Sequence, residues 1–338
     1  MDPKQIADEL RAIEGRGPCT DAERRAARAI ARQLRELGLR PRTQTVWVRP
    51  GNEWALALAC MLGVAGSVVS VDHAVTGLWI AAGGLVLLAI APLLSARRAT
   101  QTVWAGRTEE SVPTVRVLLT CRADAQPVAL AERTLARLGL PGPRVVLALS
   151  LAAIVALAAV RTGGTSGAAL GAGQLVPSAI CIALLGGFLD AWVARPGDAA
   201  AGPAAALAVL AALDDEPAQH LAPELLVAGP RSMRTFVRAQ RRDGVQATDV
   251  AVVELREGRV GFLRSDGALL PQRLHPRLVA LLRGAAPMRR GRSQSPAAAA
   301  RAARWPAIAI EGDLDDLVEL TLGLVRGLDR ELGERQVS

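Results

Sequence analysis

The sequence predicts an α/β domain in three layers, with a mixed, largely parallel central sheet, interrupted by two inserted transmembrane helical hairpins. Two observations carry this prediction. Four uncharged apolar runs come in two closely spaced pairs. In the polar segments around them, strand-like and helix-like patterns alternate, which is typical of layered α/β domains.

The apolar runs contain no Asp, Glu, Lys or Arg. A helix needs roughly 20 apolar residues to cross a hydrocarbon core of about 30 Å. The second and fourth runs meet this length, and the first falls just short. The third is shorter still, but Arg144 and Arg161 flank it and can lie at the headgroups. We therefore predict four transmembrane helices, from residues 54–71, 75–95, 145–160 and 168–189.

The pairing of the runs has a structural consequence. Each pair leaves the α/β domain and returns to it on the same side of the membrane, so that strands before and after a hairpin can still lie in one sheet. We predict five segments: residues 1–53 as the N-terminal part of the α/β domain, 54–95 as the first hairpin, 96–142 as central strands, 143–193 as the second hairpin and 194–338 as the C-terminal part.

Arginines near the runs predict the orientation. The soluble side of the runs carries many of them, whereas the loop at residues 72–74 has no basic residue and the loop at 161–167 has one. By the positive-inside rule, the chain is predicted to be a multi-pass protein of the cell membrane with its soluble domain and both termini in the cytoplasm. The lipid bilayer is then its first partner.

Charge and cysteine usage exclude other classes. The net charge is +8, but Lys4 is the sole lysine, and the arginines are not interleaved with aromatic residues as in surfaces that stack bases. We predict no nucleic-acid partner. The four scattered cysteines form no CxxC pair, so neither a disulfide framework nor a structural zinc site is indicated. No apolar run precedes Trp54, and we expect no cleavable signal peptide.

Local patterns predict the soluble elements. Thr20 and Glu23 form a capping box that opens an amphipathic helix ending near Leu37. Gly202-Pro203 begins an alanine-rich helix, and Asp313 caps the last one. The predicted strands are residues 43–48, 100–105, 115–120, 225–228, 250–255 and 305–310, and a hairpin partner of the strand at 250–255 is predicted at about 259–263. Two further helices are predicted at residues 231–241 and 275–284. A basic loop is predicted at residues 285–296.

Four of these segments, residues 17–38, 43–45, 99–103 and 117–120, follow one another as in a known family. They resemble the opening helix and first strands of the co-catalytic zinc exopeptidases, the family of aminopeptidase S, aminopeptidase Y and glutaminyl cyclase. This resemblance implies two zinc ions bridged by one carboxylate, completed by histidine and carboxylate ligands, and a glutamate that activates water.

Matching the family motif position by position shows a degenerate site. Arg122 stands where the zinc-binding histidine of H-x-D is expected, and Asp124 keeps the aspartate. Asp198 matches the bridging aspartate and Glu254 a later carboxylate ligand. The expected pair of glutamates is missing at residues 229–232, and no histidine follows the strand at 305–310.

Arginine is always protonated and has no lone pair for a metal ion. We hypothesise that Arg122 pairs with Asp198 or Glu254 and replaces the metal charge, so no cofactor is expected. The prediction is a catalytically inactive, membrane-anchored relative that binds or scaffolds, with a membrane or peptide partner at the former active-site face. Two alternatives stay open: an active zinc aminopeptidase with a rearranged metal site, or a multi-pass membrane protein unrelated to peptidases.

Other polar features have simpler interpretations. The three histidines, His73, His220 and His275, are expected to be loop or cap residues. The acidic cluster after Asp313 suits the first turn of a helix, where the macrodipole stabilises carboxylates. The basic loop is interpreted as solvated, with contact to anionic lipids as the alternative; its arginines are Arg283, Arg289, Arg290, Arg292 and Arg301.

Overall fold

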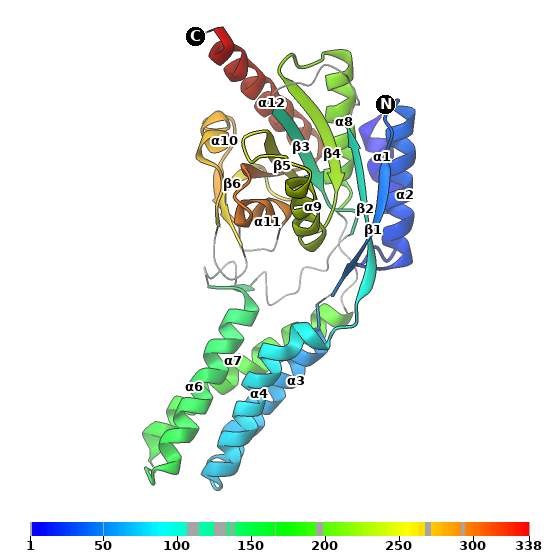
Figure 1. Cartoon of the computed structure of the whole chain (residues 1–338). Coiled ribbons are helices and arrows are strands. Elements are labelled where there is room, and N and C mark those ends of the chain that lie inside the picture. The colour runs from blue at the N-terminus through cyan, green and yellow to red at the C-terminus, as the bar shows by residue number, and fades with distance from the viewer. Residues whose placement is uncertain are drawn as a thin grey trace. The chain divides into compact units, whose positions relative to one another are not determined.

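The computed structural model describes residues 2–49, 51–106, 115–124, 134–135, 138, 140–165, 167–193, 199–267, 272–291 and 295–337. The chain forms two compact units. The first is an α/β unit made of Met1–Val48, Ala99–Gln126 and Pro196–Ser338, and the second is a helical unit made of Arg49–Arg98 and Pro127–Arg195 (Figure 1).

A nine-stranded sheet forms the centre of the α/β unit. Its strands are β1 (Arg42–Val48), β2 (Arg98–Gly106), β3 (Val115–Cys121), β4 (Leu221–Val227), β5 (Val250–Glu257), β6 (Gly261–Asp266), β7 (Gln272–Arg273), β8 (Met288–Arg290) and β9 (Ala307–Gly312). The order is β1-β2-β4-β3-β5-β9-β6-β7, and β8 pairs with β6.

The middle of this sheet is parallel and its flanks are antiparallel. β3 pairs in parallel with β4 and β5, and β5 pairs in parallel with β9. β2 joins β4 and β6 joins β9 in antiparallel pairs. Val117, Leu118 and Leu119 of β3 are buried on both faces, as expected for the central strand of a parallel sheet. The predicted mixed α/β arrangement with a central sheet is confirmed, and the parallel pairs lie in the middle of that sheet.

Helices cover both faces of the sheet. They are α1 (Pro3–Arg11), α2 (Asp21–Glu36), α8 (Ala201–Asp215), α9 (Pro230–Arg242), α10 (Pro276–Leu281), α11 (Pro296–Ala302) and α12 (Leu314–Val337). Gly202 of α8 lies against Leu255 of β5, whereas Ala297 of α11 contacts Glu254. Neighbouring strand residues point to opposite faces, so α8 and α11 lie in opposite layers. The helices α1, α2 and α12 pack with α8, and α9 packs with α11 (Figure 1).

Both predicted helix caps are present. The hydroxyl of Thr20 accepts a hydrogen bond from the backbone N–H of Glu23 at 3.2 Å, and Asp313 accepts one from Asp316 at 2.9 Å. The carboxylate of Glu23 does more than close a capping box. It accepts hydrogen bonds from the backbone N–H of Cys19 and from the hydroxyl of Thr100 in β2, so it fastens the start of α2 to the sheet.

The structure corrects three expectations for the α/β unit. β6 is not the hairpin partner of β5, because β3 and β9 already occupy both sides of β5, and β6 pairs with β9 instead. β4 begins at Leu221, before Pro223. Pro223 lies just before Glu224, the β4 residue that pairs with Gly106 at the end of β2. The short elements α1, β7, β8 and α11 were missed, and β8 lies in the predicted basic loop.

The helical unit contains α3 (Glu53–Val69), α4 (Ala74–Leu94), α6 (Pro143–Thr162) and α7 (Ala168–Val193). In the part of the chain that the structure describes, three helices are long and apolar enough to cross a membrane: α4, α6 and most of α7. The fourth, α3, is a shorter apolar helix of 17 residues. The structure thus supports three of the four predicted spans by length and composition.

Small and polar residues allow these helices to pack closely. A Cβ atom on Gly66 would lie 2.6 Å from the backbone nitrogen of Ala81, so α3 and α4 approach each other directly. Gln174 of α7 donates a hydrogen bond of 3.0 Å to the hydroxyl of Ser70. The hydroxyl of Ser178 donates one of 2.9 Å to Ser67, so hydrogen bonds join the end of α3 to α7.

The close approach of α8 to β5 gives a test of the packing. A Cβ atom on Gly202 would lie 2.7 Å from the carbonyl oxygen of Leu255, whereas one on Gly323 of α12 would meet nothing within 4 Å. We expect Gly202→Ala to lower the free energy of unfolding by about 1–3 kcal/mol, because backbone must move. Gly323→Ala should leave it unchanged or raise it by up to about 1 kcal/mol. Equal effects of the two variants in chemical denaturation would contradict this packing.

Candidate functional site at the carboxyl edge of the sheet

Charged side chains gather where the parallel strands end. The sheet register pairs Thr120 with Glu254, and Arg256 with Glu311. Alternate residues of a strand point to the same face of the sheet. Arg122 comes two residues after Thr120, so it lies on the same face as Glu254 and level with Arg256 and Glu311. Three neighbouring strands therefore bring two arginines and two glutamates to one end of one face, the end where open α/β sheets commonly bind ligands.

Arg122 follows β3 and forms a two-pronged ion pair with Asp124. Its Nε lies 3.0 Å from Oδ1 and its Nη2 2.5 Å from Oδ2 of the nearly buried carboxylate. Burial acts to lower the pKa of Arg122, but the charge and hydrogen bonds of Asp124 outweigh it, and the pKa is raised. The guanidinium stays charged, and the paired geometry holds it in place.

Arg256 makes a wider set of contacts. Its Nη1 lies 3.1 Å from Asp266, its Nη2 3.4 Å from Glu311 and its Nε 4.0 Å from Glu254. Asp266 is 0% and Glu254 1% exposed, so two of these carboxylates are removed from water. Burial acts to lower the pKa of Arg256, but Glu254, Asp266 and Glu311 together raise it. One permanent cation thus lies within 4.0 Å of three carboxylates.

The carboxylate of Glu254, on β5, lies against the N-terminus of α11. Its Oε2 accepts a hydrogen bond of 2.8 Å from the backbone N–H of Ala297, and Ser295 caps the same helix by accepting from Ala298. Burial raises the pKa of Glu254 to about 7, although Arg256 and the Ala297 N–H act in the other direction. Glu254 therefore exchanges its proton near neutral pH.

Carboxylates also approach this edge from elsewhere. Glu257 turns to the opposite face of β5 and accepts hydrogen bonds from the N–H groups of Ala200 and Ala201 at the start of α8, at 3.2 and 3.4 Å. On α2, burial raises the pKa of Glu23, the charge of Asp124 adds to this rise, and Arg122 partly opposes it. The start of α2 is thus electrically coupled to the ion pair at the end of β3.

The structure brings together most of the residues singled out from the sequence. Arg122, Asp124 and Glu254 meet at the carboxyl edge, and the charge of Glu254 contributes to the raised pKa of Arg122. Asp198 lies outside the described residues. Arg122 pairs with Asp124, and Glu254 approaches Arg256 of its own strand, so the expected pair of Arg122 with Glu254 does not form. The other expected partner of Arg122 was Asp198, and that pairing stays a prediction.

Arg256 is the residue that the sequence analysis missed. A signal for it existed: Arg256 follows directly on the apolar strand predicted over residues 250–255 and lies two residues after Glu254. Such a pair shares a face of the sheet, and a charge on a buried face requires a partner. The third carboxylate, Asp266, came from a segment whose strand partner was predicted wrongly.

The described residues do not fit a zinc centre. They contain no group of three or more His, Cys, Asp or Glu placed to hold a metal ion. Two guanidinium groups stand among the carboxylates and offer no lone pair. The histidines lie elsewhere: His73 precedes α4, His220 precedes β4 at the other end of the sheet, and His275 precedes α10.

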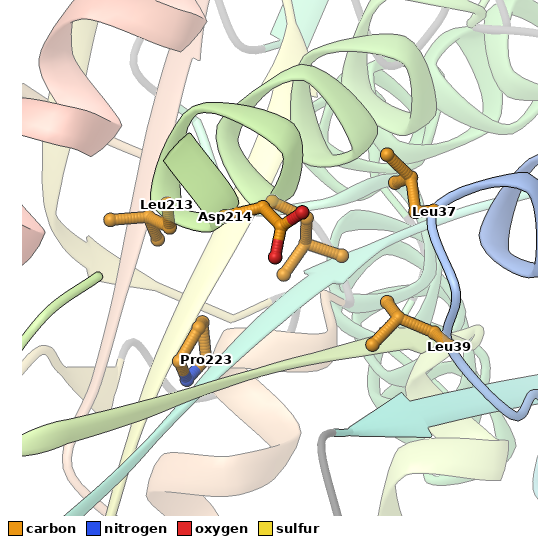
Figure 2. Close-up of a pocket in the computed structure, with 6 residues that line it drawn as sticks. Leu37, Leu39, Leu213, Asp214 and Pro223 are labelled. Carbon is orange, nitrogen blue, oxygen red and sulfur yellow. The ribbon is translucent and has the colours of Figure 1, made fainter. Parts of the chain in front are cut away.

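A small surface hollow lies away from this cluster. Figure 2 shows its lining, which is apolar apart from Asp214. Pro223 belongs to the first half of β4 and Leu213 to the last turn of α8, so the hollow lies toward the amino ends of the parallel strands. Its lining has a single carboxylate, Asp214, and no histidine or cysteine. The lining residues are Leu37, Leu39, Leu210, Leu213, Asp214 and Pro223.

No family model and no curated protein sequence matches this chain. Solved structures do match. Glutaminyl cyclase from Porphyromonas gingivalis has a TM-score of 0.51 and 11% identity, over 97% of this chain and 97% of that one. The zinc aminopeptidase from Bacillus subtilis has a TM-score of 0.51 and 9% identity, over 98% and 95%. An aminopeptidase from Aneurinibacillus sp. strain AM-1 has a TM-score of 0.51 and 8% identity, over 97% and 93%.

These likenesses confirm the resemblance at the level of the fold. The α/β arrangement is that of zinc-dependent exopeptidases and glutaminyl cyclases. At such low identity they carry no information about activity, and the chemistry of this chain has to be argued from its own residues.

The raised pKa of Glu254 predicts a dependence of stability on pH. Its pKa rises from 4.5 in the unfolded chain to about 7 in the folded one, so the folded state binds a proton more tightly. This contribution is complete below about pH 4.5 and is lost as the pH rises through about 7, on the order of 3 kcal/mol at most.

The variant Glu254→Gln should remove this slope, because its amide oxygen still accepts the Ala297 N–H but does not titrate. Urea unfolding of the full chain in nanodiscs between about pH 5 and about pH 8 measures the effect. Glu319→Gln, on the exposed side of α12, should keep the wild-type slope. The raised pKa of Glu254 would be excluded if the stability of the wild-type protein rose throughout this pH range and the Glu254→Gln variant gave the same profile.

Proposed function

We propose that this chain is a membrane-anchored protein whose exopeptidase-like domain does not hydrolyse peptides and acts by binding a membrane or peptide partner at the carboxyl edge of its sheet. The observation that carries the proposal is the ion network of Arg122 and Arg256. Two fixed cations lie among the carboxylates at the edge where this fold places its active site in zinc exopeptidases.

The network leaves little chemistry for hydrolysis. A divalent cation near Arg122 and Arg256 would be repelled by both. Asp124 is engaged on both oxygens by Arg122, and Glu254 accepts a backbone N–H and faces Arg256. Removing a general base or acid typically lowers the rate by a factor of about 100 to 10,000, before any loss of metal is counted. The site therefore suits recognition better than catalysis.

One observation favours the alternative of an active enzyme. The pKa of Glu254, about 7, is the value that suits a general base at neutral pH. An active enzyme would need a rearranged metal site built from Asp124, Asp198 and Glu254. We prefer the binding role because Glu254 is 1% exposed and its oxygens are already occupied.

Membrane anchoring through four spans is the second part of the proposal. The helical unit exposes large apolar side chains of a kind that water-soluble helices bury, among them Trp79 at 72% and Leu175 at 70% exposed. Such an exterior suits lipid. The helix α3 would complete the first hairpin with α4, which keeps the α/β unit and both termini in the cytoplasm, as the arginine distribution predicts.

Metal analysis and activity assays test the catalytic part. The full chain purified in detergent should contain substoichiometric zinc and should release neither amino acids from peptides nor ammonia from N-terminal glutamine. Stoichiometric zinc that is lost on Asp198→Ala, together with zinc-dependent turnover, would favour the active enzyme and overturn the proposal.

Cysteine labelling tests the topology. In intact cells, a membrane-impermeant maleimide should modify His73→Cys and Thr165→Cys, which lie in the loops of the two hairpins, but not Gln44→Cys on β1. After lysis, Gln44→Cys should react too. The native thiols of Cys60, Cys121 and Cys181 are buried and give little background, and the half-buried Cys19 is replaced by serine in every variant. Labelling of only one hairpin loop from outside would contradict a four-span arrangement.

A further inference from the structure

The two helix layers of the α/β unit differ in charge. α9 contains five arginines and no acidic residue, and α11 contains one arginine and no acidic residue. In the opposite layer, α12 contains six acidic residues and three arginines. Because α9 and α11 pack side by side, basic residues without acidic neighbours gather on one face of the unit (Figure 1).

One side of α9 turns its arginines into solvent. Four of them recur at positions 234, 238, 241 and 242, a spacing that places them on one face of a helix. A further exposed arginine, Arg304, follows α11, and Arg241 donates a hydrogen bond to the carbonyl oxygen of Ala303 beside it. We call this surface the arginine face; its residues, all exposed, are Arg234, Arg238, Arg241, Arg242 and Arg304.

The arginine face keeps its charge uncompensated. Within the part of the chain that the structure describes, none of its arginines forms an ion pair, not even with Asp243, the residue that follows α9. The arginines of α2 differ, since Arg24 pairs with Asp21, and Arg32 pairs with Glu9. Guanidinium groups remain protonated at physiological pH, so the arginine face carries a fixed positive charge.

The apolar side of α9 is already covered. Met233 is 0% and Val237 1% exposed, and the ring of Phe236 packs edge-on against Trp104 of β2 with ring centroids 5.9 Å apart. Among the described residues, the large apolar side chains that are exposed all lie outside α9. A partner of this helix therefore meets guanidinium groups, and it has to be recognised through negative charge.

The strands next to α9 indicate which anionic partner is at hand. α9 packs against β1, and Phe236 contacts β2. These are the strands that lead into and out of the first apolar hairpin, from Val48 to α3 and from α4 to Arg98. A bilayer that contains this hairpin is tethered to both strands, so its headgroups are present at high effective concentration. The cytoplasmic leaflet of a cell membrane carries anionic lipids that attract arginines.

We propose that the arginine face binds the headgroups of anionic phospholipids in the bilayer that anchors the chain, through charge-assisted hydrogen bonds from guanidinium groups to phosphate and carboxylate oxygens. The inference rests on the membrane-anchoring part of the proposed function and concerns residues outside the ion network at the carboxyl edge. Each arginine near an anionic surface should change the ratio of lipid-bound to unbound α9 by about fivefold. Lipid charge then decides which face of the α/β unit meets the membrane.

Spin labelling of the full chain in nanodiscs tests this binding. A nitroxide on Thr235→Cys in α9 reports the distance to a gadolinium-chelating lipid in the same disc, and one on Glu319→Cys reports it for α12; Cys19 is replaced by serine in both. We expect strong relaxation at position 235 in discs that contain phosphatidylserine, weak relaxation in phosphatidylcholine alone, and a loss of the difference at high salt. Position 319 should not respond to lipid charge.

Matched variants separate the arginine face from basic residues in general. One variant removes three charges from α9: Arg234→Gln, Arg238→Gln and Arg242→Gln. The control removes three exposed arginines from α2: Arg25→Gln, Arg28→Gln and Arg35→Gln. The α9 variant should lose the response to phosphatidylserine by about a hundredfold in the bound-to-unbound ratio, whereas the control should keep it. Lysine at the same three α9 positions should also keep it, and this variant decides the question if the glutamine variant does not fold.

Equal relaxation at position 235 in both kinds of disc, or an equal loss in the α9 and α2 variants, would overturn the proposal. If lipid charge has no effect while polyglutamate binds the wild-type chain but not the α9 variant, the arginine face serves an acidic protein and the lipid assignment is wrong. Neither result changes the zinc content, the peptidase assay or the cysteine labelling, which test the proposed function separately.

Discussion

The structure of the α/β unit depends on compensating buried charge at the carboxyl edge of its sheet. Carboxylates that are removed from water destabilise a fold unless a cation or hydrogen-bond donors neutralise them. In zinc exopeptidases this cation is a metal ion. In this chain Arg122 and Arg256 supply it covalently, and each lies on the same face of the sheet as the carboxylates it binds.

The surrounding elements hold this network from both sides. On one face, the N-terminus of α11 lies against Glu254 and supplies the N–H of Ala297. On the other, the N-terminus of α8 lies against Glu257, which accepts hydrogen bonds from Ala200 and Ala201. Helix N-termini favour negative charge, so the ends of these two helices add to the compensation by the arginines. The same edge thus combines two helix N-termini with two arginines and their carboxylate partners.

Much of the fold could be predicted because local patterns agreed with it. The apolar β3 segment was placed at the centre, and the caps at Thr20 and Asp313 marked true helix starts. The predictions that failed concern the pairing of strands that lie far apart in the sequence and a short helix between them. Nothing near Gly258 signals that β6 crosses to the far side of β9, and α11 is too short and alanine-rich to show a periodic pattern.

The candidate site was predicted in part for the same reason. Arg122 and Asp124 could be identified because they lie two residues apart after a recognisable strand. The second arginine of the site, Arg256, could not be connected to Asp266 and Glu311 before the strand order was known, because the three residues lie on β5, β6 and β9. Of the two partners expected for Arg122, Glu254 approaches Arg256 instead, although both residues lie at one edge of the sheet, and Asp198 lies outside the described residues.

Anomalous X-ray scattering at the zinc edge, from crystals of the full chain grown with zinc, tests the central claim most directly. The account predicts no zinc peak at the carboxyl edge and clear density for the guanidinium of Arg256 between Glu254, Asp266 and Glu311. A strong peak among these carboxylates and Asp124, with both arginines turned away, would contradict it.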